Sequence, residues 1–335
     1  MSTIAVMGGG AWGTALALNL AQRGGHKITL WIHSPAVAET IRTTGENVAF
    51  LPGFPLPASI GITSKAAEAL ADADIILSVM PSHHVRASYT HFAPHLHSGQ
   101  SLVSATKGVE DRSGLRMSEV ISETLAPHGL HLPIAVLSGP SFAQEVAAGA
   151  PTAVTIASRD LKLAAGIQQE FASRTLRLYT NEDVIGVELG GALKNVIAIA
   201  SGVVSGLALG HNSTAALITR GIAEITRLSI ACGGRRETLA GLSGLGDLVL
   251  TCTGSLSRNL WLGMQLGQGH GLADALAALD GKVAEGILTT SAAVELAARH
   301  RVEMPIAEQV HAILHQGKHP LAAIQDLMGR PGRDE

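Results

Sequence analysis

Cysteine is nearly absent from this sequence of 335 residues, because Cys232 and Cys252 are the only two and no CxxC pair occurs. This scarcity excludes a disulfide framework and is typical of a reducing, cytoplasmic compartment. Charged residues are also few, at 15%, and 24 Lys and Arg against 27 Asp and Glu leave a net charge of −3. This balance argues against nucleic acid or a membrane surface as the main partner.

Segments that direct a chain to a membrane are missing as well. The N-terminus has no basic region followed by an apolar run, so we expect no secretory signal. The stretch Asn195–Thr219 lacks charged residues, but glycines, His211 and Asn212 interrupt it and bulky apolar side chains are few. We therefore expect no stable membrane insertion.

No cluster of metal-ligating residues stands out. His91, His95 and His97 lie close together, but no cysteine or carboxylate accompanies them and Pro94 breaks the helix between them. A solvated helix end explains them better than a metal site, and we expect no metal. Cys252, with no histidine nearby in sequence, is interpreted as a core residue.

Hydrophobic residues, in contrast, make up 46% of the chain, and its length favours two domains. Short β-like runs alternate with helical segments up to residue 184, and beyond it only helical patterns remain. This predicts an α/β fold, with a Rossmann-type doubly wound sheet over residues 1–185 followed by an all-helical domain over 186–335. The pairing direction of the last strands stays open. The expected strands are 3–7, 28–32, 60–63, 74–79, 101–104, 134–137, 152–157 and 176–179.

The first strand leads into a glycine-rich turn. Gly8, Gly10 and Gly13 form GxGxxG directly after Thr3–Met7, and a helical pattern runs on to Gly24-Gly25 before the next strand. This context is the one that a dinucleotide-binding turn requires. Gly8 permits the tight turn, Gly10 lets the backbone approach a pyrophosphate, and Gly13 lets helix and strand pack closely. The free N–H groups of the helix then face the phosphates.

Three further loops follow strands and so lie where an open α/β sheet binds its ligands. They are Pro81-Ser82-His83, Thr106-Lys107-Gly108 and Gly139-Pro140-Ser141-Phe142. Lys107 is thereby placed to meet a small molecule, although its position alone fits an ordinary surface lysine equally well.

The stretch Val184–Leu209 is mostly apolar and carries a single lysine, Lys194. At helical spacing, Lys194 shares one stripe with small residues, so another group must approach this face closely. Glycines inside a helix need a packing or functional reason. An ammonium there loses hydration unless a partner compensates it, and such a lysine can exchange protons near neutral pH. A core helix whose lysine reaches the surface is the alternative. The stripe comprises Val187, Gly190, Gly191, Lys194, Ala198, Ser201, Gly202 and Ser205.

One polar loop, Gly241–Asn259, stands out in the apolar second half. Asp247, Ser257, Arg258 and Asn259 are its polar groups. An arginine beside a serine and an asparagine suits a phosphate, because its fork donates two parallel hydrogen bonds. A capped turn between helices is the alternative.

These motifs together resemble those of bacterial NAD(P)-dependent glycerol-3-phosphate dehydrogenases, and the resemblance runs from end to end. The matching blocks are GGGAWGTALA, FLPGFPLP, VMPSHHVR, SATKG, SGPSFAQEV, ELGGALKNVIAIASG, GLSGLGDLVLTCTGSLSRN, AEGILTT and VEMPI. The resemblance implies a Rossmann domain, a helical domain and an active site between them. It also implies reversible hydride transfer between NADP or NAD and the pair dihydroxyacetone phosphate and sn-glycerol 3-phosphate, in service of phospholipid synthesis.

The resemblance further implies roles for individual residues. Lys194 is the catalytic proton donor and acceptor at the substrate C2 oxygen. The substrate positions are Lys107, Gly139, Ser141, Lys194, Asp247, Ser257, Arg258 and Asn259. The cofactor positions, besides Gly8, Gly10 and Gly13, are Ala11, Trp12, His33, Lys107, Ala143, Arg258, Val283 and Glu285.

Three positions depart from the family pattern. Ala11 replaces a serine, His33 replaces an arginine, and His211 replaces the aspartate of GLGDN. No acidic residue follows the second strand before Glu39, so nothing there repels a 2′-phosphate, and Arg42 on the following helix is the nearest arginine. We therefore expect both cofactors to work, with a moderate preference for NADPH.

Two other functions are kept in view. One is a dehydrogenase of another small hydroxy acid or phosphate, and the other is a nucleotide-binding sensor without turnover. Lys194 and the SLSRN loop argue against the sensor. The oligomeric state stays open, with a homodimer as one option.

Overall fold

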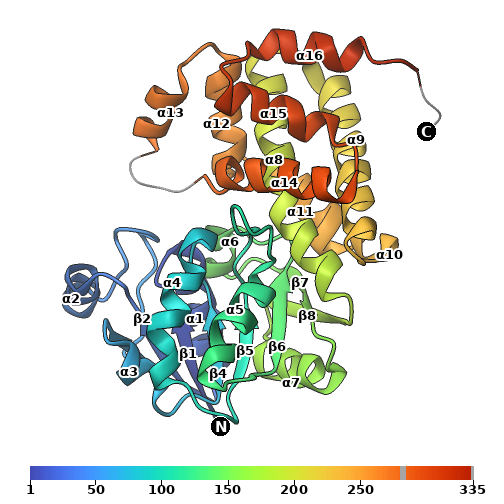
Figure 1. Cartoon of the computed structure of the whole chain (residues 1–335). Helices are drawn as coiled ribbons and strands as arrows, with labels where there is room; N and C mark the ends of the chain where they lie inside the picture. Colours follow the sequence, from blue (N-terminus) through green and yellow to red (C-terminus); the bar gives the residue numbers. More distant parts are fainter. Residues whose placement is uncertain (280–283, 333–335) are drawn as a thin grey trace. The chain divides into compact units, whose positions relative to one another are not determined.

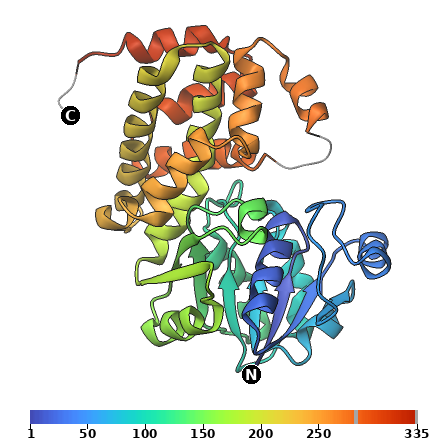
Figure 2. The same ribbon diagram turned by 180° about the vertical axis from the view of Figure 1, so that it is seen from behind.

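The computed structural model describes residues 1–279 and 284–332, and the chain divides into two compact units (Figures 1 and 2). Unit 1 comprises Met1–Lys107 and Arg116–Val187, and unit 2 comprises Gly108–Leu115 and Glu188–Glu335. The short segment Gly108–Leu115 packs with unit 2, where the Arg299 guanidinium donates to the carbonyl oxygens of Arg112 and Ser113. The domain ranges 1–185 and 186–335 stay a prediction. The two compact units differ from these ranges at Gly108–Leu115, which belongs to unit 2 although it lies within 1–185.

Unit 1 is built on one sheet of eight strands in the order β3-β2-β1-β4-β5-β6-β7-β8. Neighbouring strands run parallel except β6 and β7, which are antiparallel. Strand order reverses between β1 and β4, so the crevice that binds ligands in such sheets lies beyond their carboxyl ends. The strands are β1 Ser2–Met7, β2 His26–Trp31, β3 Ile60–Thr63, β4 Ile75–Ser78, β5 Ser101–Ser104, β6 Ile134–Ser138, β7 Thr152–Ala157 and β8 Leu176–Asn181.

Helices cover both faces of this sheet. Leu16 of α1 and Phe171 of α7 share one buried core with Val6, Val103 and Leu137 of the strands. Helices α4 and α5 lie over the opposite face (Figure 1). The sequence prediction of a doubly wound sheet is therefore confirmed, with the last two strands, β7 and β8, running antiparallel to the other six. The helices of unit 1 are α1 Ala11–Arg23, α2 Pro35–Thr44, α3 Ala66–Leu70, α4 Val85–Phe92, α5 Met117–Leu125, α6 Ala143–Ala147 and α7 Leu161–Phe171.

The regular secondary structure of unit 2 is helical in its described residues, as the sequence predicts. Helix α8, Val184–Gly206, starts in unit 1 and runs into unit 2, and Leu193, Ile197 and Val203 along it are buried. The other helices are α9 Gly210–Ala231, α10 Arg236–Leu239, α11 Asp247–Thr253, α12 Arg258–Gly267, α13 Leu272–Ala278, α14 Gly286–His300, α15 Pro305–His315 and α16 Pro320–Met328, with a π-helical turn at Leu242–Gly246.

Helix α8 is also, within the described part of the chain, long and apolar enough by length and composition to cross a membrane. However, 89% of its most apolar window is buried inside the protein. The bent pair Arg236–Thr253 and Arg258–Gly267 passes the same test only when it is counted as one span. The burial of α8 is typical of the core helix of a globular protein.

Candidate active site

The glycine-rich turn lies at the carboxyl end of β1, beside the end of β4. Gly8 has a φ of +131°, and a Cβ there would overlap the carbonyl oxygen of Val79. A Cβ on Gly13 would overlap the carbonyl oxygen of Gly8, so side chains are excluded at both positions. Gly10 differs, because a Cβ there would meet nothing within 4 Å. The turn thus has two packed glycines and one that borders open space, as a pyrophosphate cradle requires.

The N-terminus of α1 follows this turn directly. Gly10 is the N-cap residue and provides no side-chain cap, and the half-buried Ala11 and Trp12 form the first turn. Ala11 carries no hydroxyl, so the N–H groups of this turn are the donors that the helix start can offer. These groups and the positive end of the helix dipole suit an anion. The residues present therefore fit a dinucleotide phosphate.

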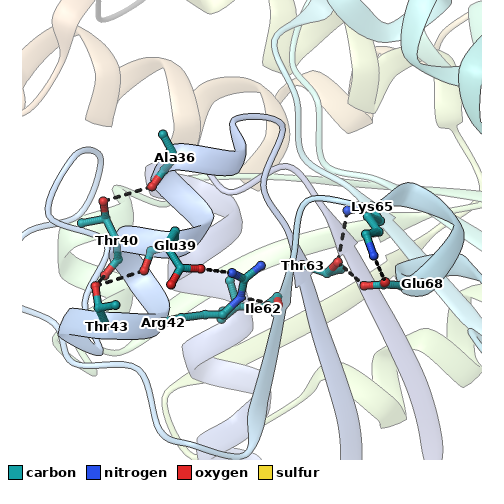
Figure 3. Close-up of polar contacts among 9 residues, drawn as sticks. All are labelled: Ala36, Glu39, Thr40, Arg42, Thr43, Ile62, Thr63, Lys65 and Glu68. Carbon is teal, nitrogen blue, oxygen red and sulfur yellow. Dashed lines mark hydrogen bonds and ion pairs between the residues drawn. The ribbon is translucent and has the colours of Figure 1, made fainter.

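The end of β2 carries His33, an exposed residue whose ring meets Trp31 edge-on at 5.7 Å between centroids. Arg42, the nearest arginine in sequence, has partners elsewhere. Its Nε donates to the carbonyl oxygen of Ile62 at 3.3 Å, and its guanidinium forms an ion pair with Glu39 (Figure 3). Arg42 therefore lies against the edge strand β3.

A second basic residue, Lys65, lies just beyond β3. Its Nζ is 2.8 Å from Glu68 Oε1, and the Thr63 hydroxyl donates to the same carboxylate at 2.7 Å (Figure 3). The hydrogen bonds from Lys65 and then Thr63 lower the pKa of Glu68. Both cations near the β2 and β3 ends are therefore already paired with acids.

The loops after β5 and β6 meet at one carbonyl group. Lys107 Nζ donates to Gly139 O at 3.1 Å, and the Ser141 hydroxyl donates to the same oxygen at 3.0 Å. Gly139 has a φ of +147° and its Cβ would crowd Val154, so only glycine fits there. Ala143, four residues after Gly139, begins the short helix α6. The structure thus brings together the predicted positions Lys107, Gly139 and Ser141.

Lys194 is buried rather than reaching the surface. It is 7% exposed, and its ammonium pairs with Asp247, which is fully buried. Lys194 Nζ also donates to the Thr251 hydroxyl at 2.9 Å, and that hydroxyl donates to the Asp247 carbonyl oxygen at 2.6 Å. A buried ammonium is stable only with such compensation. A carboxylate and a hydroxyl therefore hold the predicted catalytic amine in one position.

Cys252, next to Thr251, belongs to the core as interpreted from the sequence. Its side chain is buried, and burial raises the pKa of its thiol to about 12 against the opposing effect of the Lys194 charge. The thiol is protonated at neutral pH and takes no part in proton exchange.

The small-residue stripe of α8 packs against protein backbone. A Cβ on Gly190 would lie 2.6 Å from the carbonyl oxygen of Ser243. Cβ atoms on Gly202 and Gly206 would overlap carbonyl oxygens of α12, where Gly263 and Gly267 face them in turn. At two glycines of the stripe, Gly190 and Gly202, the expected close approach is therefore made by the chain itself, and Gly206 beside the stripe packs in the same way.

The predicted phosphate loop forms the start of α12. Ser257 is its N-cap, with the hydroxyl accepting from Leu260 N at 3.2 Å, so the alternative of a capped turn is realised. Asn259 is buried, donates to Asn195 Oδ1 at 3.0 Å and accepts from Gly286 N at 3.0 Å. Arg258 is exposed at the first helical position, and no partner for it is found among the described residues. Arg258 and the second amide hydrogen of Asn259 are two side-chain donors left for an anion.

Glu285 directly precedes α14 and is half-buried, and Val283 lies outside the described residues. In residues 1–279 and 284–332, no group of three His, Cys, Asp or Glu side chains could hold a metal ion. Two polar residues of the site do not stand out from the sequence, Thr251 and Asn195. Thr251 follows Asp247 by one helical turn, a spacing that could have predicted its contact.

The family models and the curated relatives of this chain agree on one family. The model of the NAD-dependent glycerol-3-phosphate dehydrogenase N-terminus matches residues 3–164, and that of the C-terminus matches residues 183–325. A relative from Acidobacterium capsulatum, named glycerol-3-phosphate dehydrogenase (NAD(P)+), is 66% identical over all of both chains. A relative of the same name from Koribacter versatilis is 59% identical over 100% of this chain and 99% of its own. The crystal structure of glycerol-3-phosphate dehydrogenase from Coxiella burnetii is 40% identical, with a TM-score of 0.94 over 98% of this chain and 99% of its own.

Proposed function

The chain belongs to the NAD-dependent glycerol-3-phosphate dehydrogenase family, and on this basis we propose that it interconverts dihydroxyacetone phosphate and sn-glycerol 3-phosphate with NAD(P)H or NAD(P)+. The observation that carries the proposal is the buried Lys194 ammonium, which Asp247 and Thr251 hold on an otherwise apolar helix. When bound, the nicotinamide supplies or accepts the hydride at the substrate C2 carbon.

Lys194 is the proton donor in the direction of reduction. As C2 gains hydride, negative charge develops on its oxygen, and an ammonium within hydrogen-bond reach both stabilises that charge and supplies the proton. Asp247 and Thr251 fix the Nζ atom, so little reorganisation is needed during the reaction. In the oxidation direction, neutral Lys194 takes the proton back from the C2 hydroxyl.

The remaining polar positions bind and orient. Arg258 binds the substrate phosphate through two parallel, charge-assisted hydrogen bonds from its guanidinium, and the second amide hydrogen of Asn259 adds another. Lys107 and Ser141, joined through the Gly139 carbonyl, contact the substrate. The dinucleotide pyrophosphate lies on Gly8–Gly13 and the first turn of α1, and the positions His33, Ala143, Val283 and Glu285 complete cofactor binding.

The biological setting follows from the product. We propose that the enzyme works in the cytoplasm and supplies sn-glycerol 3-phosphate for phospholipid synthesis, with a homodimer as its assembly. Size-exclusion chromatography with light scattering tests the assembly, and fractionation of the cells that express the protein tests the compartment.

The reaction itself is tested by NAD(P)H absorbance with dihydroxyacetone phosphate as the substrate. We expect rapid oxidation of the reduced cofactor, and far slower oxidation with pyruvate or ketopantoate. Oxidation with only a non-phosphorylated oxo acid would favour a hydroxy-acid dehydrogenase instead. Cofactor binding without turnover of any of these substrates would favour a sensor.

A further inference from the structure

Asn47 lies in the loop that follows α2, on a rigid stretch of backbone. Its carbonyl oxygen accepts from Leu51 N at 2.8 Å and from Phe50 N at 3.2 Å, and Leu51 is itself buried in the core of unit 1. Gly45, just before it, ends α2 with a φ of +71° and donates to Ile41 O at 2.8 Å. The side chain of Asn47 is fully buried. Its amide therefore sits in a fixed place.

The side-chain amide of Asn47 is hydrogen-bonded to the glycine-rich turn and to the helix that follows it. Its Nδ2 donates to the carbonyl oxygen of Gly9 at 2.8 Å and to the hydroxyl of Thr14 at 2.8 Å. Thr14 is fully buried on α1, and its N–H in turn donates to Gly10 O at 3.0 Å. One side chain thus links the middle of the turn to the first helical turn.

These bonds determine where the next peptide N–H points. A trans peptide is planar, so the Gly9 carbonyl and the Gly10 N–H point in opposite directions. With the carbonyl held toward Asn47, the Gly10 N–H points away from the loop. A Cβ on Gly10 would meet open space, and within the described chain the Gly10 N–H has no hydrogen-bond acceptor. A donor without a partner, at a helix N-terminus, suits a phosphate oxygen.

The amide oxygen of Asn47 indicates that the residue serves as a hydrogen-bond donor here. Asn47 Oδ1 is buried and has no protein partner in the described chain. An unpaired buried acceptor is unfavourable, so an apolar side chain of similar size would suit the packing better. Such a side chain would leave Gly9 O and the turn without their anchor.

We propose that Asn47 is a positioning residue for the cofactor pyrophosphate, acting through the Gly9 carbonyl to aim the Gly10 N–H at a phosphate. This inference rests on the proposed function and adds a residue outside the glycine motif to it. Because Ala11 has no hydroxyl to offer, the orientation of the backbone donors carries more of the phosphate binding here.

The test compares wild type with Asn47→Asp and Asn47→Leu, using ADP, NADH and phosphate-free adenosine as ligands in calorimetric or competition titrations. Asn47→Asp keeps the shape but turns an acceptor toward Gly9 O, and Asn47→Leu removes the donors without adding a charge. Glu46→Gln is the matched control, because Glu46 accepts from Gly53 N in the same loop and does not touch the glycine turn.

We expect both Asn47 variants to bind ADP and NADH at least about tenfold more weakly, the loss of one well-placed hydrogen bond. Adenosine affinity, kcat and the KM for dihydroxyacetone phosphate should change less than twofold, and so should every constant of Glu46→Gln. If one Asn47 variant does not fold, the other decides.

Unchanged ADP affinity in a folded Asn47 variant would overturn the proposal. An equal loss of ADP and adenosine binding would overturn it too, since it would indicate general loosening of the domain. Wild-type protein that binds ADP and NADH without turnover contradicts only the proposed reaction, and protein that binds neither contradicts both.

Discussion

Replacing Lys194 by alanine should lower both the turnover number and the free energy of unfolding. The side chain is 7% exposed and its partner Asp247 is fully buried. Removing one member of a buried pair leaves the other charge uncompensated, at a cost of about 3–5 kcal/mol in the free energy of unfolding. Loss of the proton donor and of charge stabilisation should lower kcat by about a thousandfold or more. NADH binding should stay nearly intact.

The double variant Lys194→Ala with Asp247→Asn distinguishes the two effects. Neutralising Asp247 removes the unpaired charge, so most of the lost unfolding free energy should return, as measured by urea denaturation. Turnover, followed by NADH absorbance with dihydroxyacetone phosphate, should not return. Activity that recovers together with stability would mean that the single variant fails only through misfolding. A single variant that keeps more than a tenth of wild-type kcat would make Lys194 a structural residue.

Three other perturbations test separate parts of the molecule. Arg258→Ala should raise the KM for dihydroxyacetone phosphate about tenfold or more without lowering the melting temperature, since Arg258 is exposed and a charge-assisted bond is worth about 1.5–3 kcal/mol; an unchanged KM removes Arg258 from the site. The preference for NADPH in kcat/KM should widen in His33→Arg and reverse in His33→Asp, because a fixed positive charge there attracts a 2′-phosphate and a carboxylate repels it; a preference that both variants leave unchanged contradicts this. Burial raises the pKa of Glu224 from 4.5 to about 7. The folded state then binds the extra proton, so the free energy of unfolding should fall by about 3 kcal/mol between pH 4.5 and 7. In Glu224→Gln, the free energy of unfolding should depend less on pH over this range. The same pH dependence in the variant and the wild type would refute the role of Glu224.

Local patterns were sufficient for most of unit 1. Each strand of the sheet was predictable within about two residues, because apolar runs between helical segments depend on neighbours in sequence. The roles of Gly8, Gly10 and Gly13 were predictable for the same reason. The antiparallel direction of β7 was not, since nothing local in Thr152–Ala157 encodes which neighbour it pairs with or in which direction.

Contacts between residues far apart in the sequence were harder to predict. The stripe on α8 showed that something comes close, but not that α12 supplies it with glycines of its own. The pairing of Lys194 with a residue 53 positions away needed the fold, although the family resemblance named both residues. The contact of Asn47 with the glycine-rich turn could not be predicted from the sequence. A single asparagine in a turn is common, and no periodicity distinguishes one that binds a distant loop from one that does not.

The glycine contacts between α8 and α12 bear on how the proposed catalytic and phosphate-binding residues could be re-engineered. Lys194 is on α8 and Arg258 opens α12, and the two helices touch main chain to main chain at Gly202 and Gly263. No side chain lies between them there that could rearrange to absorb a change. A methyl group at Gly202 would overlap the carbonyl oxygen of Leu260, so the backbones of α8 and α12 would have to separate there. If Lys194 and Arg258 have the roles proposed above, main-chain packing fixes the distance between them, and we expect the enzyme to accept only substrates whose carbonyl and phosphate match that distance.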